Sequence, residues 1–119
     1  MKLLIVDDNA RMRGLIRNLV RDLADEIYEC ASAEEAFAAY SAHQPDWVLM
    51  DVEMPVMDGI TASRNLIRMF PDARIVMVTR YDDDELRQEA RLAGARGYVL
   101  KEDLSALGPL LAGTTSISG

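Results

Sequence analysis

The sequence predicts an α/β fold in which five parallel strands form one doubly wound sheet. Five short apolar or β-rich runs are separated by longer stretches with helical periodicity, which is the layout of repeated βα units. Four of these runs are almost unbroken in apolar character, as strands covered on both faces are, whereas strands with one wet face alternate. The expected strands are residues 3–6, 27–30, 47–50, 75–78 and 98–100.

Length and composition favour one globular domain. The chain has 119 residues, of which 50% are hydrophobic and 28% charged. A domain of this size buries about two-thirds of the surface of its unfolded chain, so it needs no disulfide or metal to support its core. We expect the domain to span residues 1–112, and the small polar residues 113–119 to form a flexible tail or the start of a linker.

Cysteine content, hydropathy and charge restrict the location and the partners. Cys30 is the only cysteine, which excludes an internal disulfide and favours the reducing cytoplasm. No apolar run approaches the roughly 18 residues that a membrane span needs, and no signal peptide is recognisable. The net charge of −7 repels nucleic acid phosphates and anionic lipids. We therefore expect neither nucleic acid binding nor membrane association by these residues.

The first helix is expected to begin after Asn9, a residue type that caps helix N-termini. Its apolar residues repeat at helical spacing and predict one face toward the core. The residues expected on this face are Met12, Leu15, Ile16, Leu19 and Leu23.

The second and third helices carry recognisable start signals. Ser32 and Glu35 have the spacing of a capping box and predict a helix that continues to about residue 42. Asp58 is the expected cap of the next helix, which must end before Pro71 because proline disrupts a helix interior.

The last two helices are defined by charge and by helix-breaking residues. Acidic residues at 82–85 favour a helix start because they complement the positive end of the helix dipole, and Gly94 is the expected end of this helix. The segment 103–112 contains Gly108 and Pro109, which a regular helix tolerates poorly. It is therefore predicted to be a short or kinked helix.

Polar side chains follow four of the five expected strands, and they are Asp7, Asp8, Asp51, Thr79 and Lys101. The C-terminal ends of parallel strands lie at one edge of the sheet, so these groups should converge there. The second strand alternates in character and ends without such a group, so we place it at the sheet edge. The predicted strand order is therefore 2-1-3-4-5.

The converging groups point to a magnesium-dependent phosphoryl transfer. Two carboxylates 5 Å apart repel each other by roughly 3 kcal/mol at an effective dielectric of 20, and a third makes this worse. A cation relieves the repulsion, and oxygen ligands without His or Cys favour Mg²⁺. With Thr79 and Lys101 beside it, an aspartate at this edge could attack phosphorus and form an acyl phosphate.

The sequence also resembles a known family, the receiver domains of two-component response regulators, from residue 2 to about residue 111. The motifs that carry the resemblance are LLIVDDN at 3–9, WVLMDVEMPVMDG at 47–59, IVMVT at 75–79 and AGARGYVLK at 93–101. The segments DARIVMVTRYDDDEL at 72–86 and AGARGYVLK at 93–101 are most similar to receivers that precede a helix-turn-helix DNA-binding output domain. The resemblance implies a flavodoxin-like fold with the strand order given above.

The resemblance further implies a role for each site residue. Asp51 would be the phospho-acceptor, and Thr79 and Lys101 would bind the phosphoryl group. Tyr98 would act with Thr79 as a conformational switch. The implied Mg²⁺ ligands are Asp7, Asp8, Asp51 and the main-chain carbonyl of Glu53.

By the same resemblance, the chain is a phosphorylation-activated switch, and its only enzymatic activity is its own Mg²⁺-dependent phosphorylation and dephosphorylation. The implied phosphodonor is a histidine kinase or a phosphotransfer protein. The surface expected to change is formed by the fourth helix, the fifth strand and the fifth helix. This surface would serve an output domain, a partner or a homodimer, and the implied process is transcription regulation.

Four residues depart from the family pattern. Lys101 is followed by Glu102 where the family usually has proline, and Glu53 adds an acid beside the site. Arg80 and Tyr81 are bulky neighbours of Thr79 that could screen water or a phosphodonor.

Three other functions fit the sequence less well. A phosphatase of the haloacid dehalogenase type also uses an aspartate nucleophile, but its Asp-x-Asp motif follows the first strand and its chain is longer. An unphosphorylated interaction module would not need the polar strand ends to be intact. A flavin protein of similar topology would need a phosphate-binding loop rich in Ser, Thr or Gly after the first strand, which is missing here.

Overall fold

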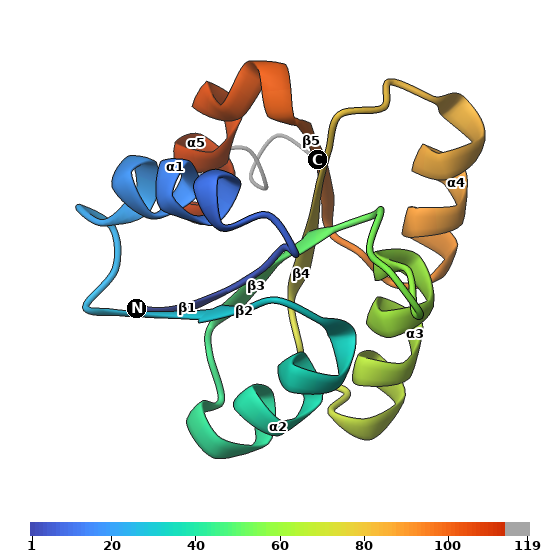
Figure 1. Cartoon of the computed structure of the whole chain (residues 1–119), viewed down its shortest axis with the longest axis horizontal. Helices are drawn as coiled ribbons and strands as arrows, with labels where there is room; N and C mark the ends of the chain where they lie inside the picture. Colours follow the sequence, from blue (N-terminus) through green and yellow to red (C-terminus); the bar gives the residue numbers. More distant parts are fainter. Residues whose placement is uncertain (114–119) are drawn as a thin grey trace.

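The computed structural model describes residues 1–113, in which five parallel strands form one sheet between two helical layers (Figure 1). The strands are β1 (Lys2–Val6), β2 (Glu26–Cys30), β3 (Trp47–Asp51), β4 (Ile75–Thr79) and β5 (Gly97–Leu100). They are arranged in the order β2-β1-β3-β4-β5, and every neighbouring pair is parallel. The predicted fold class and strand order are confirmed.

Helices alternate with the strands along the chain and cover both faces of the sheet. They are α1 (Ala10–Val20), α2 (Ala33–His43), α3 (Gly59–Met69), α4 (Asp84–Leu92) and α5 (Leu107–Leu111), the last preceded by the 3-10 helix η1 (Lys101–Ala106). Figure 1 shows α1 and α5 on one side of the sheet and α2, α3 and α4 on the other. None of the helices in the described part of the chain is long and apolar enough to span a membrane.

The core has two halves because successive side chains of a strand point to opposite faces of the sheet. Leu4 and Val48 belong to the half under α2, α3 and α4, whereas Leu3 and Leu49 belong to the half under α1 and α5. The strands β1, β3 and β4 are apolar on both faces and almost fully buried. The edge strand β2 is more exposed, in agreement with its alternating sequence.

The predicted helix caps are confirmed. The side chains of Asn9, Ser32 and Asp58 each accept a hydrogen bond from the backbone N–H three residues further on. Within the acidic run, Asp83 is the residue that caps α4. Gly94 lies just beyond the end of α4 with a φ of 105°, a conformation that glycine adopts without strain.

The predicted core face of the first helix was partly wrong. Ile16 and Val20 are buried, but Leu15, Leu19 and Leu23 are 49%, 52% and 36% exposed. The helix ends at Val20, so Leu23 lies outside it. Two neighbouring stripes with a spacing of four residues are apolar, and helical periodicity alone did not show which of them the sheet would cover.

The C-terminal segment is short and broken, as predicted, but the break lies elsewhere. The irregular residue is Asp103 in η1, with φ −133° and ψ 56°. Pro109 lies in the first turn of α5, where backbone N–H groups have no partner within the helix, so its missing N–H does no harm. Of the expected tail, residues 114–119 lie outside the described part of the chain.

Candidate functional site

The C-terminal ends of β1 and β3 bring three carboxylates together. Val6 pairs with Met50 in the sheet, so Asp7 and Asp51 emerge side by side. Both are almost fully buried, at 1% and 5% exposure, while Asp8 is exposed. One carboxylate oxygen from each of the three residues lies within 4.8 Å of the others. The predicted acidic cluster is therefore present.

Lys101 supplies the positive charge of this cluster. Its Nζ lies 2.9 Å from Asp7 Oδ2 and 3.4 Å from Asp51 Oδ1, and its side chain is only 12% exposed. Lys101 directly follows β5, which is separated from β3 by β4, so the long side chain reaches past the end of β4. The ammonium thus links the two buried carboxylates.

The backbone of the loop after β1 fixes the orientation of Asp7. The N–H of Asn9 donates to Asp7 Oδ1 at 2.8 Å, and Arg13 Nη1 donates to the Asp7 carbonyl at 2.7 Å. The other carboxylate oxygen of Asp7, Oδ2, is buried and accepts no hydrogen bond of good geometry from the described residues. Its partner is the ammonium of Lys101, and it remains available to a second cation.

Burial is the main influence on Asp51. It raises the pKa of Asp51 to about 6, and the nearby carboxylate of Asp7 acts in the same direction. The ammonium of Lys101 and the N–H of Glu53, 3.4 Å from Asp51 Oδ1, lower this pKa but do not cancel the effect. At neutral pH Asp51 is therefore mostly ionised, and a nearby cation stabilises its buried negative charge.

These oxygen donors fit a magnesium ion. Asp7, Asp8 and Asp51 are hard ligands without a nearby His or Cys in the cluster, and the buried Asp7 Oδ2 lacks a hydrogen-bond donor of good geometry. Mg²⁺ commonly takes one or two carboxylates and keeps several waters, which an arrangement with one exposed carboxylate allows. The side chain of Glu53 lines a neighbouring pocket instead.

Gly59 allows the start of α3 to pack against the end of β3. A Cβ at this position would lie 1.9 Å from the Asp51 carbonyl oxygen and 2.8 Å from its carbonyl carbon. The Gly59 N–H also donates to the Val52 carbonyl at 2.8 Å. Only glycine permits this approach. Sequence reasoning identified residue 59 as a helix start and missed this requirement.

Thr79 ends β4 at the same edge and is fully buried. Its Oγ1 accepts a hydrogen bond from the Tyr81 N–H at 3.2 Å. In the sheet Asp51 pairs with Val78, and Thr79 with Leu100, so Thr79 lies between the strand ends that carry Asp51 and Lys101. Thr79, predicted to lie at the end of the fourth strand, therefore belongs to the same site.

Tyr98 lies within β5 and is half-buried. Its hydroxyl donates to the Tyr81 carbonyl at 2.7 Å, and the Arg87 guanidinium lies 4.5 Å above the centre of its ring. Tyr81 is thus contacted through its N–H by Thr79 and through its carbonyl by Tyr98. The two predicted switch residues are connected through one loop residue.

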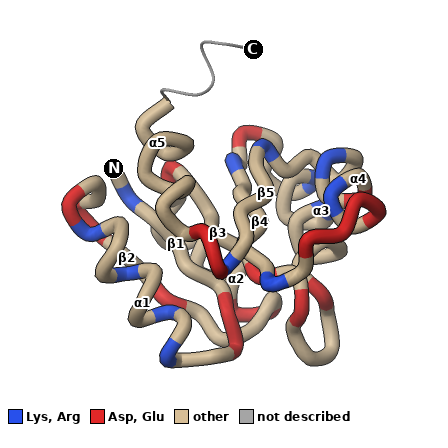
Figure 2. The backbone as a smooth tube through the Cα atoms, turned by 90° about the horizontal axis from the view of Figure 1, so that it is seen from above, with Lys and Arg blue, Asp and Glu red and all other residues tan. Residues whose placement is uncertain are grey.

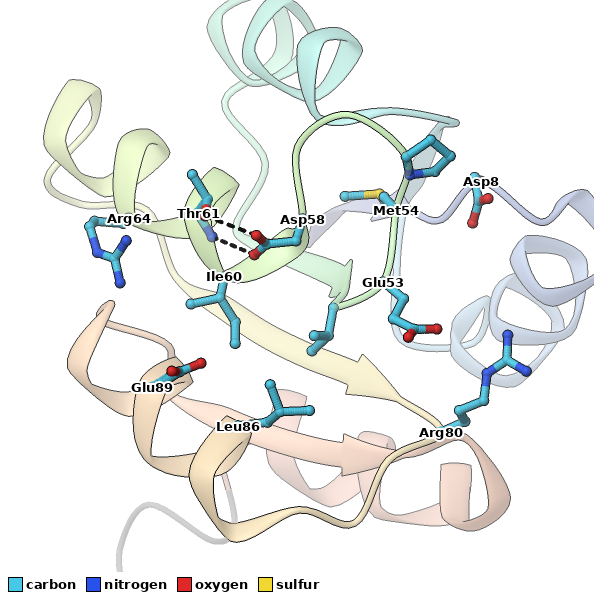
Figure 3. A pocket seen from close by; sticks show the side chains of 12 residues that line it. Asp8, Glu53, Met54, Asp58, Ile60, Thr61, Arg64, Arg80, Leu86 and Glu89 are labelled. Atoms are coloured by element: carbon cyan, nitrogen blue, oxygen red, sulfur yellow. Dashed lines mark hydrogen bonds between the residues drawn. The ribbon is translucent and has the colours of Figure 1, made fainter.

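Two cavities open beside the carboxylates. The first, of about 430 Å³, is lined by residues that include Asp7, Asp51, Lys101 and Arg80. The second, of about 730 Å³, lies between α3 and α4 and is shown in Figure 3. Asp8 and Arg80 line both cavities. Sequence reasoning noted Arg80 only as a bulky neighbour of Thr79, because its place between the cavities depends on the fold.

Comparison with known proteins gives one consistent family. The family model described as "Response regulator receiver domain" matches residues 3–108. Among curated proteins, the chain is similar to an uncharacterized transcriptional regulatory protein, YhcZ of Bacillus subtilis, with 39% identity over 104 residues. The match covers 86% of this chain and 49% of YhcZ, so the chain spans about half the length of that relative.

Solved structures show the same likeness. A two-component response regulator of the LuxR family from Aurantimonas sp. SI85-9A1 superposes with a TM-score of 0.83 at 33% identity, covering 94% of this chain and 85% of that one. A CheX-CheY-BeF3-Mg complex from Borrelia burgdorferi gives a TM-score of 0.81 at 25% identity, with 93% and 88% covered.

Proposed function

Because the chain belongs to the response regulator receiver domain family, we propose that it is a signalling switch in which Asp51 accepts the phosphoryl group. The observation that carries the proposal is the position of the Asp51 carboxylate. It lies at the end of β3, beside the Lys101 ammonium, and lines the 430 Å³ cavity. Asp7 is the more buried of the two carboxylates, and one of its oxygens is held by the Asn9 N–H. This favours Asp51 as the acceptor.

In the proposed reaction an oxygen of Asp51 forms a bond to phosphorus, while the bond from phosphorus to the leaving group breaks. The leaving group, a histidine nitrogen of a kinase or phosphotransfer protein or the oxygen of a small acyl phosphate, departs with the electron pair. Lys101 then contacts a phosphoryl oxygen, and the Thr79 hydroxyl contacts another. Both side chains already lie at this edge of the sheet.

We assign Asp7, Asp8, Asp51 and the main-chain carbonyl of Glu53 to a magnesium site. Mg²⁺ would supply positive charge that offsets the carboxylates and the phosphoryl oxygens. The acidic cluster within 4.8 Å and the buried Asp7 Oδ2 support this assignment. The similar CheX-CheY complex from Borrelia burgdorferi contains BeF3 and Mg²⁺, which supports the same assignment for this chain.

The switch is proposed to run from Thr79 to Tyr98 through Tyr81. When Thr79 turns its hydroxyl toward the phosphoryl group, the Tyr81 N–H loses its present acceptor. The Tyr81 carbonyl, which holds the Tyr98 hydroxyl, then shifts with the loop. The surface formed by α4, β5 and α5 therefore changes, as a two-state packing change driven by a local charge.

We infer that the altered surface controls an output domain, a partner or a homodimer, and that the process is transcription regulation in the cytoplasm. The similarity to a transcriptional regulatory protein and to a LuxR-family regulator supports the process. The kinase or phosphotransfer protein is the expected upstream partner. Apart from its own phosphorylation and dephosphorylation, no enzymatic activity is proposed.

The proposal is tested by intact mass spectrometry of the wild type and the Asp51→Asn variant, each incubated with Mg²⁺ and acetyl phosphate. We expect one added phosphoryl group on the wild type alone, removed by hydroxylamine, which cleaves acyl phosphates. A stable adduct on the variant would refute Asp51 as the acceptor. Continuous release of phosphate from a phosphomonoester over many cycles would instead indicate a phosphatase.

A further inference from the structure

Arg80 is an exposed cation next to the acceptor site. It follows Thr79 directly, and within residues 1–113 its guanidinium forms no hydrogen bond or ion pair. The centre of the Tyr81 ring lies 5.9 Å from the guanidinium carbon. Lys101, by contrast, is engaged with two buried carboxylates. Arg80 is therefore available to an incoming anion without breaking an existing ion pair.

Arg80 also lines the cavities beside the acceptor. It lines the 430 Å³ cavity that contains Asp51 and also the 730 Å³ pocket between α3 and α4. Figure 3 shows Arg80 and Glu53 extending from different elements into the same part of that pocket, with Asp8 at its rim. A molecule bound in the cavity that contains Asp51 therefore lies beside Arg80.

The surrounding negative charge opposes the approach of an anionic donor, so a cation at the cavity favours its binding. The chain has a net charge of −7, and Asp8 and Glu53 add negative charge at the entrance. In Figure 2 the long red stretch beside α4 marks a further acidic run, residues 82–85. A phosphodonor carries negative charge at neutral pH, so it is repelled from this side of the molecule. A guanidinium can bind two phosphoryl oxygens at once and offsets that repulsion.

We propose that Arg80 binds the phosphoryl group of an anionic small-molecule phosphodonor, such as an acyl phosphate, and directs it to Asp51. The proposal rests on the proposed function, because it concerns the donor used by the same site. The proposed role and a purely steric role of Arg80 have opposite effects on the rate of phosphorylation. A side chain that only blocks the entrance slows phosphorylation, whereas a capturing cation accelerates it.

The test measures the second-order rate constant for phosphorylation by acetyl phosphate with Mg²⁺ in the wild type, Arg80→Met, Arg80→Lys and Arg64→Met. Methionine keeps much of the length of the side chain and removes its charge. Lysine keeps the charge. Arg64 is the matched control because it lines the pocket between α3 and α4 but not the cavity that contains Asp51.

We expect Arg80→Met to react about 10-fold more slowly at low ionic strength, since local cations raise association rates by about 10-fold or more. The difference should narrow at high salt, Arg80→Lys should react at a rate between those of Arg80→Met and the wild type, and Arg64→Met should match the wild type. An equal or faster rate for Arg80→Met would overturn the capture of the donor by Arg80. If Arg80→Lys reacts as slowly as Arg80→Met, the positive charge of Arg80 is not the cause of the faster reaction.

The two proposals fail in different ways. If the wild type gains no phosphoryl group on Asp51, the proposed function is wrong, and the role of Arg80 is wrong with it. If the wild type is phosphorylated on Asp51 and Arg80→Met reacts at the same rate, only the role of Arg80 is wrong.

Discussion

The hydroxyl of Tyr98 donates a hydrogen bond of 2.7 Å to the backbone carbonyl of Tyr81. This bond connects β5 to the loop between β4 and α4, two segments that are 17 residues apart in the sequence. The same loop residue donates its N–H to Thr79 Oγ1. The backbone of Tyr81 is thus hydrogen-bonded both to the end of β4 and to β5.

Replacing Tyr98 with phenylalanine tests the strength of this connection. The ring and its packing remain, but the Tyr81 carbonyl loses its donor, so the free energy of unfolding should fall by about 1 kcal/mol. Urea denaturation measures the change. Tyr81→Phe is the matched control, because within the described residues the Tyr81 hydroxyl makes no hydrogen bond and the backbone carbonyl is retained. Equal losses in the two variants would contradict the role of the Tyr98 hydroxyl.

Gly59→Ala should destabilise the protein strongly. The added Cβ would lie 1.9 Å from the Asp51 carbonyl oxygen, so β3 or α3 must move, at a cost of about 2 kcal/mol or more. Gly14→Ala is the control, since a Cβ there meets no heavy atom within 4 Å. In the interior of α1 this change should instead stabilise by about 0.5–1 kcal/mol. Thermal denaturation of both variants checks the opposite signs, and a neutral Gly59→Ala would disprove the close contact.

The raised pKa of Asp51 predicts how stability depends on pH in the absence of metal. In the folded protein this pKa is about 6, above the ordinary value of 3.8, so between these values the folded state binds more protons than the unfolded state. The contribution of Asp51 to the free energy of unfolding therefore falls as pH rises from about 4 to 6. Asp51→Asn avoids this loss of stability and should raise the free energy of unfolding at pH 7 by about 3 kcal/mol.

The measurement is urea denaturation of the wild type and of Asp51→Asn at pH 4 and pH 7 in the presence of a metal chelator. The advantage of the variant should be much smaller at pH 4, where the folded wild type holds its proton. A difference between the two proteins that is the same at both pH values would contradict burial as the main influence on Asp51.

Lys101→Met is predicted to destabilise the protein without metal and to respond strongly to Mg²⁺. The change leaves the buried carboxylates of Asp7 and Asp51 without their ammonium, at a cost of roughly 2–4 kcal/mol. A divalent ion among the carboxylates would replace part of the lost charge. Chemical denaturation with and without Mg²⁺ should show a larger gain from the metal in the variant than in the wild type. No gain in the variant would contradict a shared cation site.

Much of the fold could be predicted because local signals agreed with one another. Each strand was found to within about one residue at either end, since buried parallel strands read as apolar runs. The caps at Asn9, Ser32 and Asp58 have short-range causes that a sequence displays directly. The convergence of Asp7, Asp51 and Lys101 followed from the parallel topology alone.

The features that sequence reasoning missed depend on long-range packing. The exposure of Leu15 and Leu19 was decided by how α1 lies on the sheet, which periodicity does not determine. The close approach of Gly59 to Asp51 and the place of Arg80 between two cavities arise from loops whose paths no local pattern specifies. The departure from the family at Lys101–Glu102 is accommodated with a trans peptide, since none of the described peptide bonds is cis.

Lys101 has a second consequence through its place in the chain. Its ammonium contacts the carboxylates, while its backbone begins η1. This short helix continues into α5, where Leu107 is buried in the half of the core under α1. On the opposite face, Thr79 accepts a hydrogen bond from the Tyr81 N–H, and the Tyr81 carbonyl accepts one from Tyr98. The Tyr98 ring in turn contacts Arg87 of α4. The edge of the sheet that carries Asp51 is thus connected to both helical layers, through Lys101 and η1 on one face and through Tyr98 and Arg87 on the other.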